Sequence, residues 1–209
     1  MKRLLITAGP TREPIDAVRF ISNRSSGRMG IALAHAGAAA GHDVTLLLGP
    51  TALAPPDGVV LKRFETGDDL RRLLDDHHEA MDALLMAAAV CDYRPRRQHT
   101  GKRRTTKGEA WQLNLQATED LVAEVARSRA PHQRVVAFAL ENPGDLDTRA
   151  REKLSRKQVD AIVANPLRTM DAETIEPVWM THEGRQAAPG IMQKEDAAAW
   201  IIAQLEALW

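Results

Sequence analysis

A run of small, polar and basic residues between two apolar segments carries the clearest chemical signal in this sequence. The first apolar segment breaks at Gly9, and the motif SNRSSG (22–27) later leads into an alanine-rich helix. A helix N-terminus presents unpaired N–H groups and a partial positive charge, and glycine lets a phosphate approach the backbone. Arginines add charge-assisted bonds, here from Arg19, Arg24 and Arg28. The run predicts an anion site; the alternative is a capped, solvated basic turn.

A second group follows another apolar run. The segment AAAVCDYRP (87–95) has small side chains, Ala88 and Ala89, that permit close approach by a ligand, and then Asp92, which can accept from a ribose hydroxyl or a base amine. The alternative is an aspartate that caps a loop. The next 15 residues, 94–108, are basic and poor in apolar side chains. They predict a lid over a polyphosphate, although a solvated loop has the same composition.

A third group lies further along. Phe138 stands at the end of a predicted strand, where its ring can face a base. Lys153 and Lys157 are four residues apart on a predicted helix and therefore share one face. A phosphate chain between them would relieve their repulsion, but so would Glu152, Asp160 or water.

The pattern of apolar segments places these groups on an α/β fold. Strands are expected over 3–8, 43–48, 59–64, 83–90, 135–140 and 161–164, and helices over 28–40, 68–78, 145–157 and 195–208. Alternating strands and helices predict a Rossmann-like, doubly wound, mostly parallel sheet. A late β-hairpin is expected over 168–189, with its turn at Glu183-Gly184. Nothing divides the chain, so one domain over 1–209 is expected.

Composition excludes several classes of protein. The 28 basic and 28 acidic residues give no net charge, which argues against bulk binding to nucleic acid or to an acidic membrane. A single cysteine, Cys91, suits a reducing cytoplasm. The apolar runs are too short for a membrane span or a signal peptide. The glycine fingerprint of dinucleotide-binding proteins and the ribose carboxylate after the second strand are missing, which disfavours an NAD(P)-dependent reductase.

Together these segments resemble the bacterial phosphopantothenoylcysteine synthetases, the phosphopantothenate–cysteine ligases of coenzyme A biosynthesis. The match covers residues 4–165 and includes ITAGPTREPIDAVRFISNRSSGRMG, AAAVCDYRP, TEDLV (118–122) and REKLSRKQVDAIVAN. The resemblance implies a Rossmann-like homodimer that uses Mg²⁺ and CTP. The carboxylate of 4′-phosphopantothenate attacks the α-phosphorus of CTP and releases pyrophosphate, and the amine of cysteine then displaces CMP from the acyl-cytidylate.

The resemblance also assigns roles to single residues. It implies that Asn23 holds the activated acyl group, that Arg19 belongs to the same catalytic turn, and that Lys102 in the basic loop acts on the reacting phosphate. The remaining positions would bind the nucleotide, namely Gly9, Ser25, Ser26, Gly27, Ala88, Ala89, Asp92, Glu119, Asp120, Leu121, Val122, Phe138, Lys153 and Lys157. No metal ligand is assigned.

Several positions depart from the family pattern. Cys91 stands in place of Ala, Glu119 in place of Pro, and Leu140 and Asn142 in place of Ala and Thr. The basic loop reads Lys-Arg-Arg from Lys102 instead of Lys-x-Lys-Lys. All of these except Cys91 lie on the nucleotide side and leave ATP open as the nucleotide. The departure in the basic loop also leaves open a non-catalytic protein that binds pantothenate or nucleotide. Because the first strand begins the sequence, a stand-alone ligase is expected, with a separate decarboxylase acting next in the pathway.

Overall fold

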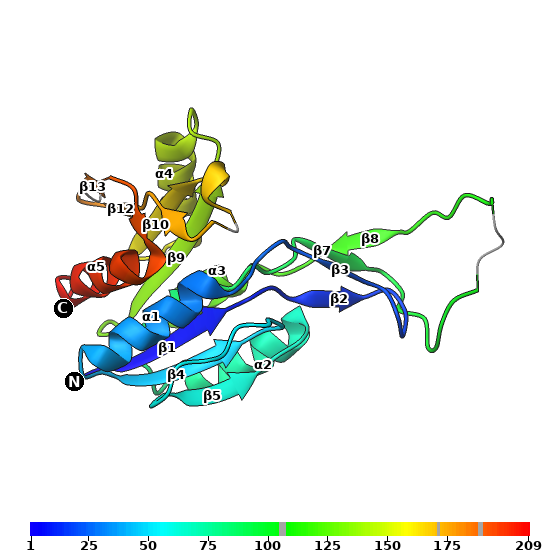
Figure 1. The fold of residues 1–209 in the computed structure, drawn as a ribbon, viewed down its shortest axis with the longest axis horizontal. Coiled ribbons are helices and arrows are strands. Elements are labelled where there is room, and N and C mark those ends of the chain that lie inside the picture. The colour runs from blue at the N-terminus through cyan, green and yellow to red at the C-terminus, as the bar shows by residue number, and fades with distance from the viewer. Residues whose placement is uncertain (105–107, 171, 188–189) are drawn as a thin grey trace.

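The computed structural model describes residues 1–104, 108–170, 172–187 and 190–209, and its centre is a twisted sheet (Figure 1). The order in this eight-stranded sheet is β13-β12-β10-β9-β6-β1-β4-β5. The six strands from β10 to β5 pair in parallel, whereas β12 and β13 join antiparallel at one edge. The strands are β1 (Arg3–Ala8), β4 (Asp43–Leu48), β5 (Val60–Arg63), β6 (Ala83–Met86), β9 (Arg134–Glu141), β10 (Ala161–Pro166), β12 (Val178–Thr181) and β13 (Arg185–Ala187).

Helices cover both faces of this sheet. On one face α1 (Arg28–Ala39) and α5 (Lys194–Glu206) pack on apolar side chains such as Leu4, Ile6 and Val163. On the other face α2 (Gly67–His77), α3 (Leu121–Ser128) and α4 (Leu146–Lys157) pack on the alternate residues of the same strands. Alternate side chains of a strand point to opposite faces, so the central strands are apolar throughout, as buried parallel strands require.

Local signals explain where α1 ends and where α2 begins. Helix α1 ends at Ala39, and Gly41, with a φ of +82°, closes the last turn by donating its N–H to Ala38 O. Helix α2 begins with a capping box, in which Thr66 accepts from the N–H of Asp69 and Asp69 accepts from the N–H of Thr66. Within α1, Gly30 lies against β1, where a Cβ would stand 2.4 Å from the Cβ of Ala8. This contact sets how closely the helix packs on the sheet.

Two hairpins project from the sheet as an arm, which comprises residues 11–22, 93–104 and 108–118 (Figure 1). The first hairpin pairs β2 (Arg12–Pro14) with β3 (Phe20–Ser22), and the second pairs β7 (Tyr93–Pro95) with β8 (Leu115–Ala117). The arm starts where β1 and β6 end, since Thr11 N–H donates to Ala89 O and Ala89 N–H donates to Gly9 O. The arm therefore continues two neighbouring strands of the sheet.

The predicted fold class is confirmed, including the late hairpin, whose strands β12 and β13 meet at the expected turn. The apolar run 83–90 forms a strand only as far as Met86. Helix α3 and the short strands of the arm were not predicted. Small elements β11 (Thr174–Ile175), β14 (Met192–Gln193) and a 3₁₀ turn (Leu167–Thr169) complete the description. Lys107 of the basic loop and Pro189 of the predicted hairpin lie outside the described residues.

In the part of the chain that is described, no helix combines the length and the apolar character needed to cross a bilayer.

Candidate active site

Two hollows meet at the carboxyl edge of the parallel strands, where α/β sheets bind ligands. The larger has a volume of about 760 Å³ and the smaller about 530 Å³. Both are lined by Ala88, Ala89, Asp92, Phe138 and Leu140, which form the boundary between them. We refer to them as the α1 hollow and the α4 hollow, after the helices that close them.

The SNRSSG motif, for which the sequence predicts an anion site, lines the α1 hollow. Gly27 is the N-cap of α1 with a φ of +79°, and it has no side chain to occupy the N–H groups of the first turn. Thr51 holds the motif in place by donating its hydroxyl to Ser26 O at 2.7 Å. The N–H of Arg28 donates weakly to Ser26 Oγ at 3.5 Å. Ser25, Ser26 and the first turn of α1 therefore border the space in which an anionic group would lie.

Asn23 connects the two walls of this hollow. Its Nδ2 donates to Ala89 O at 3.2 Å and to Val90 O at 3.0 Å, across 66 and 67 residues of sequence. These bonds hold the amide plane at the end of β6, next to the small residues Ala88 and Ala89. The structure thus brings the SNRSSG motif, the small residues after β6 and Phe138 together at the α1 hollow.

Each of the two predicted lysines of the α4 hollow is paired with a carboxylate. Lys157 Nζ lies 2.6 Å from Asp120 Oδ1, and Lys153 Nζ lies 2.5 Å from Glu141 Oε1. The two lysines do share one helix face, as predicted, but their counter-ions are neither Glu152 nor Asp160. Instead the carboxylates come from the N-cap of α3 and the end of β9, so each ammonium group is already paired within the chain.

The segment TEDLV forms the entrance to α3 and lines the α4 hollow. Asp120 caps α3 by accepting from Ala123 N–H at 3.3 Å, while Glu119 is paired with Arg71 of α2. Leu121 and Val122 are buried in the first turn. Glu119, which departs from the family pattern, therefore ties this wall of the hollow to α2.

Gly9 is the one predicted nucleotide-binding residue that does not line either hollow in the described structure. It has a φ of +82°, and Gly27 lies so close that a Cβ on Gly27 would stand 3.3 Å from Gly9 Cα. Gly9 therefore packs directly against the SNRSSG turn at Gly27. This close contact explains why a residue without a side chain stands at position 9.

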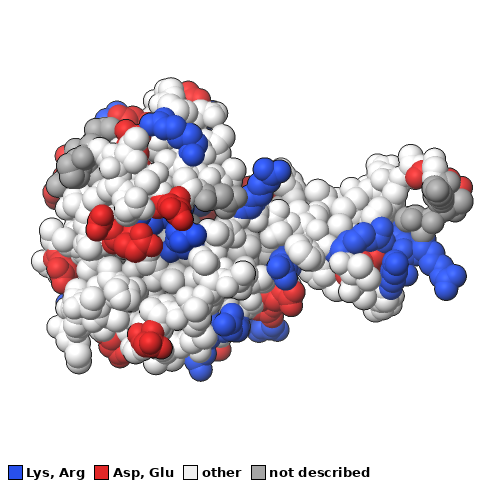
Figure 2. All heavy atoms as spheres, in the orientation of Figure 1, with Lys and Arg blue, Asp and Glu red and all other residues white. Residues whose placement is uncertain are grey.

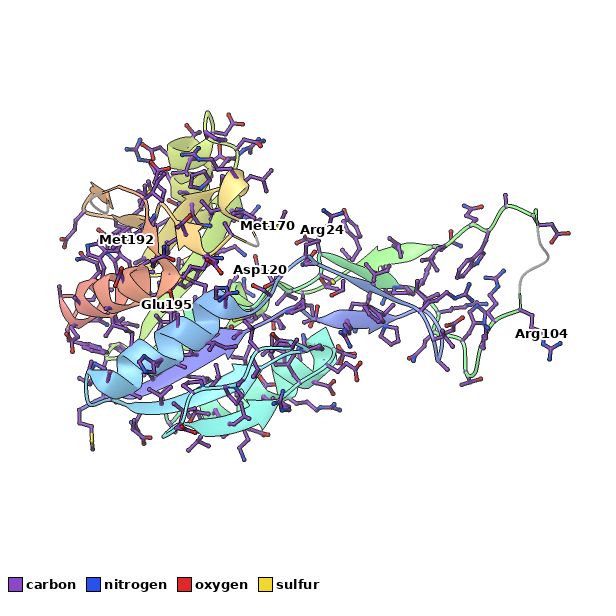
Figure 3. The ribbon with its side chains drawn as sticks, in the orientation of Figure 1. Arg24, Arg104, Asp120, Met170, Met192 and Glu195 are labelled. Atoms are coloured by element: carbon purple, nitrogen blue, oxygen red, sulfur yellow. The ribbon has the colours of Figure 1, made fainter. Side chains whose placement is uncertain are left out.

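Arg19 and Lys102 lie in the arm, away from both hollows. Arg19 is paired with Asp16 and stacks on Trp111, with 4.6 Å from its guanidinium carbon to the ring centroid. Lys102 is exposed in the basic loop. Figure 3 shows Arg24 and Asp120 near the root of the arm and Arg104 near its far end, and Figure 2 shows Lys and Arg gathered on the outer part of the arm. The hollows and the lysine are therefore separate within one chain.

Some residues of the site were not predicted. Leu167, Thr169, Met170, Ile175 and Lys194 line the α1 hollow from a segment that follows β10. They have no local motif and reach the site only because the chain folds back after β10. Arg156 adds a third cation to the α4 hollow. Among the described residues, no group of three or more His, Cys, Asp or Glu could hold a metal ion.

The fold and the site together define a Rossmann-like α/β protein whose ligand site lies at the carboxyl edge of the sheet. The chain belongs to the family described as DNA/pantothenate metabolism flavoprotein, C-terminal domain, whose profile matches residues 1–208.

Individual relatives agree with this assignment. The chain is 39% identical over 199 residues to the coenzyme A biosynthesis bifunctional protein CoaBC of Mycobacterium tuberculosis, with 90% of this chain and 48% of the relative covered. It is 43% identical over 168 residues to a cysteine/cysteine sulfinic acid decarboxylase of an unidentified prokaryote, with 80% and 46% covered. The chain thus spans about half the length of these relatives.

A solved structure matches over nearly its whole length. The crystal structure of the C-terminal domain of the coenzyme A biosynthesis bifunctional protein CoaBC is 33% identical and superposes with a TM-score of 0.85. The match covers 99% of this chain and 95% of that one. The present chain is therefore similar in sequence and in fold to one domain of a bifunctional enzyme.

Proposed function

We propose that this chain is a phosphopantothenate–cysteine ligase of coenzyme A biosynthesis. The observation that carries the proposal is the meeting of the α1 and α4 hollows, which gathers most of the residues that the family resemblance assigns to the reaction. Membership of the pantothenate family and the similarity to a CoaBC domain support the same substrates.

The chemistry requires two negatively charged reactants to meet. The carboxylate oxygen of 4′-phosphopantothenate attacks the α-phosphorus of CTP, and pyrophosphate leaves as the acyl-cytidylate forms. The amine of cysteine then attacks the acyl carbon, and CMP leaves as the amide bond forms. Catalysis is mainly alignment and charge neutralisation. The first turn of α1 and the SNRSSG motif suit a phosphate, and the Asn23 amide in the wall of the same hollow would orient the acyl group.

The α4 hollow suits the nucleotide. Phe138 presents a half-buried ring between the two hollows, and Asp92 offers an acceptor beside it. On binding, phosphate oxygens would replace Asp120 and Glu141 as partners of Lys157 and Lys153. We propose CTP as the nucleotide. Glu119 and Leu140, which both depart from the family pattern, line this hollow and bear on the choice between CTP and ATP.

Mg²⁺ would accompany the nucleotide. Mg²⁺ is commonly held by one or two carboxylates together with substrate phosphates, and the α4 hollow offers Asp92 and Asp120 for this. The ion supplies charge neutralisation at the phosphates when bound. Two carboxylates suit a metal ion that arrives bound to the triphosphate. Among the described residues, no group of three or more His, Cys, Asp or Glu could hold an ion by itself.

A homodimer would complete the site. The arm exposes the apolar side chains of Val18, Phe20, Tyr93 and Leu115, which a second copy could cover. It also carries Lys102 away from the hollows of its own chain. We therefore propose that the arms of two copies pair and that each Lys102 serves the hollow of the other copy.

Mixed dimers test this arrangement. Lys102→Ala and Asn23→Ala chains carrying different tags are co-expressed, and the heterodimer is purified. If Lys102 acts on the partner's hollow, one of the two sites keeps both residues, and the heterodimer recovers about half of wild-type turnover. If Lys102 acts within its own chain, both sites are defective. An inactive heterodimer, or a monomeric wild-type protein, would refute the exchange.

The reductase alternative is disfavoured by the course of the chain. Between β1 and α1 the chain runs out into the arm and back, through β2 and β3, instead of making the tight glycine turn of dinucleotide-binding proteins. A titration with NADH and NADPH, followed by tryptophan fluorescence, checks this directly.

The decisive assay is pyrophosphate release from 4′-phosphopantothenate and Mg²⁺ with CTP or ATP, with and without cysteine. Sustained release with CTP that needs both phosphopantothenate and cysteine is the expected result. Faster release with ATP would keep the reaction and overturn the nucleotide. Folded protein that releases no pyrophosphate with either nucleotide would be a binding protein instead of a ligase.

A further inference from the structure

The segment that carries Lys102 is fastened to the turn between β2 and β3. His99 N–H donates to Ile15 O at 3.1 Å, and Ala17 N–H donates to Gly101 O at 3.3 Å. These two bonds hold the backbone just before Lys102 against the tip of the first hairpin. The basic loop is thus attached to the arm at the point where its lysine is presented.

Asp16 is the centre of this attachment. Its side chain is buried in the arm, and Oδ1 accepts from the N–H groups of Val18 and Arg19, both at 2.9 Å. Its other oxygen, Oδ2, accepts from Arg103 N–H at 3.1 Å and from Arg19 Nε at 3.0 Å. One carboxylate therefore joins the hairpin turn to the residue that directly follows Lys102.

A stacked arrangement holds the returning part of the loop to the same place. The indole ring of Trp111 lies against two guanidinium groups, at 4.6 Å from that of Arg19 and 4.7 Å from that of Arg103. Arg19 also donates to Arg103 O at 3.1 Å. Cation–π contacts of this kind add to the charge-assisted bonds of the carboxylate.

The charge of Asp16 is maintained by its partners. The Arg19 guanidinium beside it holds the pKa of this carboxyl well below its ordinary range, with further help from three backbone N–H groups. The carboxylate is therefore ionised throughout the pH range in which a ligase assay is run.

We propose that Asp16 is a positioning residue, which holds the backbone on both sides of Lys102 and so sets where the ammonium group is presented. The inference rests on the proposed function of Lys102. A loop whose backbone is already held loses less conformational entropy when its lysine meets the reacting phosphate. Arg19 then orients Asp16 and Arg103, because its guanidinium group donates to the Asp16 carboxylate and to Arg103 O.

Asp16→Asn tests this with little change of shape. The amide oxygen can still accept from Val18 and Arg19 N–H, but the amide nitrogen would face the N–H of Arg103 and the Arg19 guanidinium, donor against donor. Asp82→Asn is the matched control, since Asp82 also accepts a backbone N–H and an arginine side chain, both from Arg3, at the opposite edge of the sheet.

Two measurements separate positioning from general stability. For Asp16→Asn we expect kcat for pyrophosphate release to fall about 10²-fold while the KM for the nucleotide stays near that of wild type. Amide hydrogen exchange within 99–103 should accelerate, whereas exchange in α1 and α4 should not. Asp82→Asn should leave both kcat and the exchange of 99–103 unchanged.

Other outcomes would overturn the inference. Unchanged exchange in 99–103 would show that Asp16 does not fasten the loop, and accelerated exchange with unchanged kcat would show that the fastening does not position Lys102. If Asp16→Asn does not fold, Trp111→Leu, which removes the stacked contacts and leaves the turn intact, should give the same pattern. Absence of turnover in the wild-type chain would refute the proposed function, whereas the exchange measurement would still decide the fastening.

Discussion

At the scale of single residues, Asn23 joins the two walls of the α1 hollow. Its amide spans from the SNRSSG motif to the carbonyl groups of Ala89 and Val90. The side chain is itself exposed to the hollow, so it serves both as a connection and as a polar group for a ligand.

Asn23→Ala should therefore fold and lose most of its activity. We expect kcat to fall about 10²–10³-fold, the usual effect of removing one oriented hydrogen-bonding group from a reacting centre. The measurement is pyrophosphate release, with thermal unfolding as the check on folding. Turnover close to that of wild type would show that the amide has no part in the reaction.

Cys91 is the residue for which the structure predicts low reactivity. The thiol is 3% exposed, and burial raises the pKa of Cys91 above its ordinary value. Its Sγ donates to Thr11 O and Ile21 O, at 3.7 and 3.8 Å.

Alkylation by iodoacetamide at pH 7.5 (about one unit below an ordinary thiol pKa) should be slow in the folded protein and complete in denaturant. Mass spectrometry of the intact chain over time measures this. The Cys91→Ala variant should stay active, because the proposed reaction uses no thiol of the enzyme. Rapid labelling without denaturant would contradict the buried environment.

At the scale of elements, the contact between α1 and β1 determines where the helix N-terminus stands. Gly30 lies on the buried side of α1, and a Cβ there would meet Ala8 Cβ at 2.4 Å and Thr7 O at 2.7 Å. Because these are a strand side chain and a strand backbone atom, neither can move aside easily.

Gly30→Ala should destabilise the protein by about 1–3 kcal/mol, the usual cost of overpacking a core, although alanine favours helices. Urea unfolding measures the change. Gly144→Ala is the control, because a Cβ at Gly144 meets no atom within 4 Å. Equal stabilities of the two variants would mean that α1 can shift on the sheet without cost.

The elements also show which features a sequence can predict. Gly41 and the apolar run 43–48 indicated a helix end and a strand because each signal is local. The pairs Lys157–Asp120 and Lys153–Glu141 join distant segments, so the lysine spacing predicted one shared face but not its partners. Helix α3 was missed because its eight residues are short for a periodic pattern, although Asp120 is an ordinary N-cap.

At the scale of the whole molecule, carboxylates with low pKa values link folding to pH. Burial opposes the ionisation of Asp69 and Asp82, but hydrogen bonds from Thr66 and from Arg3, respectively, outweigh it and hold both pKa values below the ordinary 3.8. Their stabilising contribution is therefore complete above the unfolded-state pKa and is lost as the pH falls through the folded-state pKa.

The free energy of unfolding should fall as the pH drops below about 4. Asp82→Asn should be less stable than wild type at pH 7, and the difference should shrink as the pH approaches the folded-state pKa. Urea unfolding at pH 7, 5, 4 and 3 (a series about the ordinary carboxyl pKa) gives the comparison. A difference that stays constant with pH would show that the Asp82 charge does not contribute.

The root of the arm has a mechanical consequence. The arm leaves the sheet where β1 and β6 end, and the bonds from Thr11 and Asn23 to Ala89 hold it there beside the walls of the α1 hollow. A small rotation about this root moves the far end of the arm much further than it moves the hollow. Because the root of the arm is bonded to the walls of the α1 hollow, a partner that binds the arm and turns it would also act on those walls.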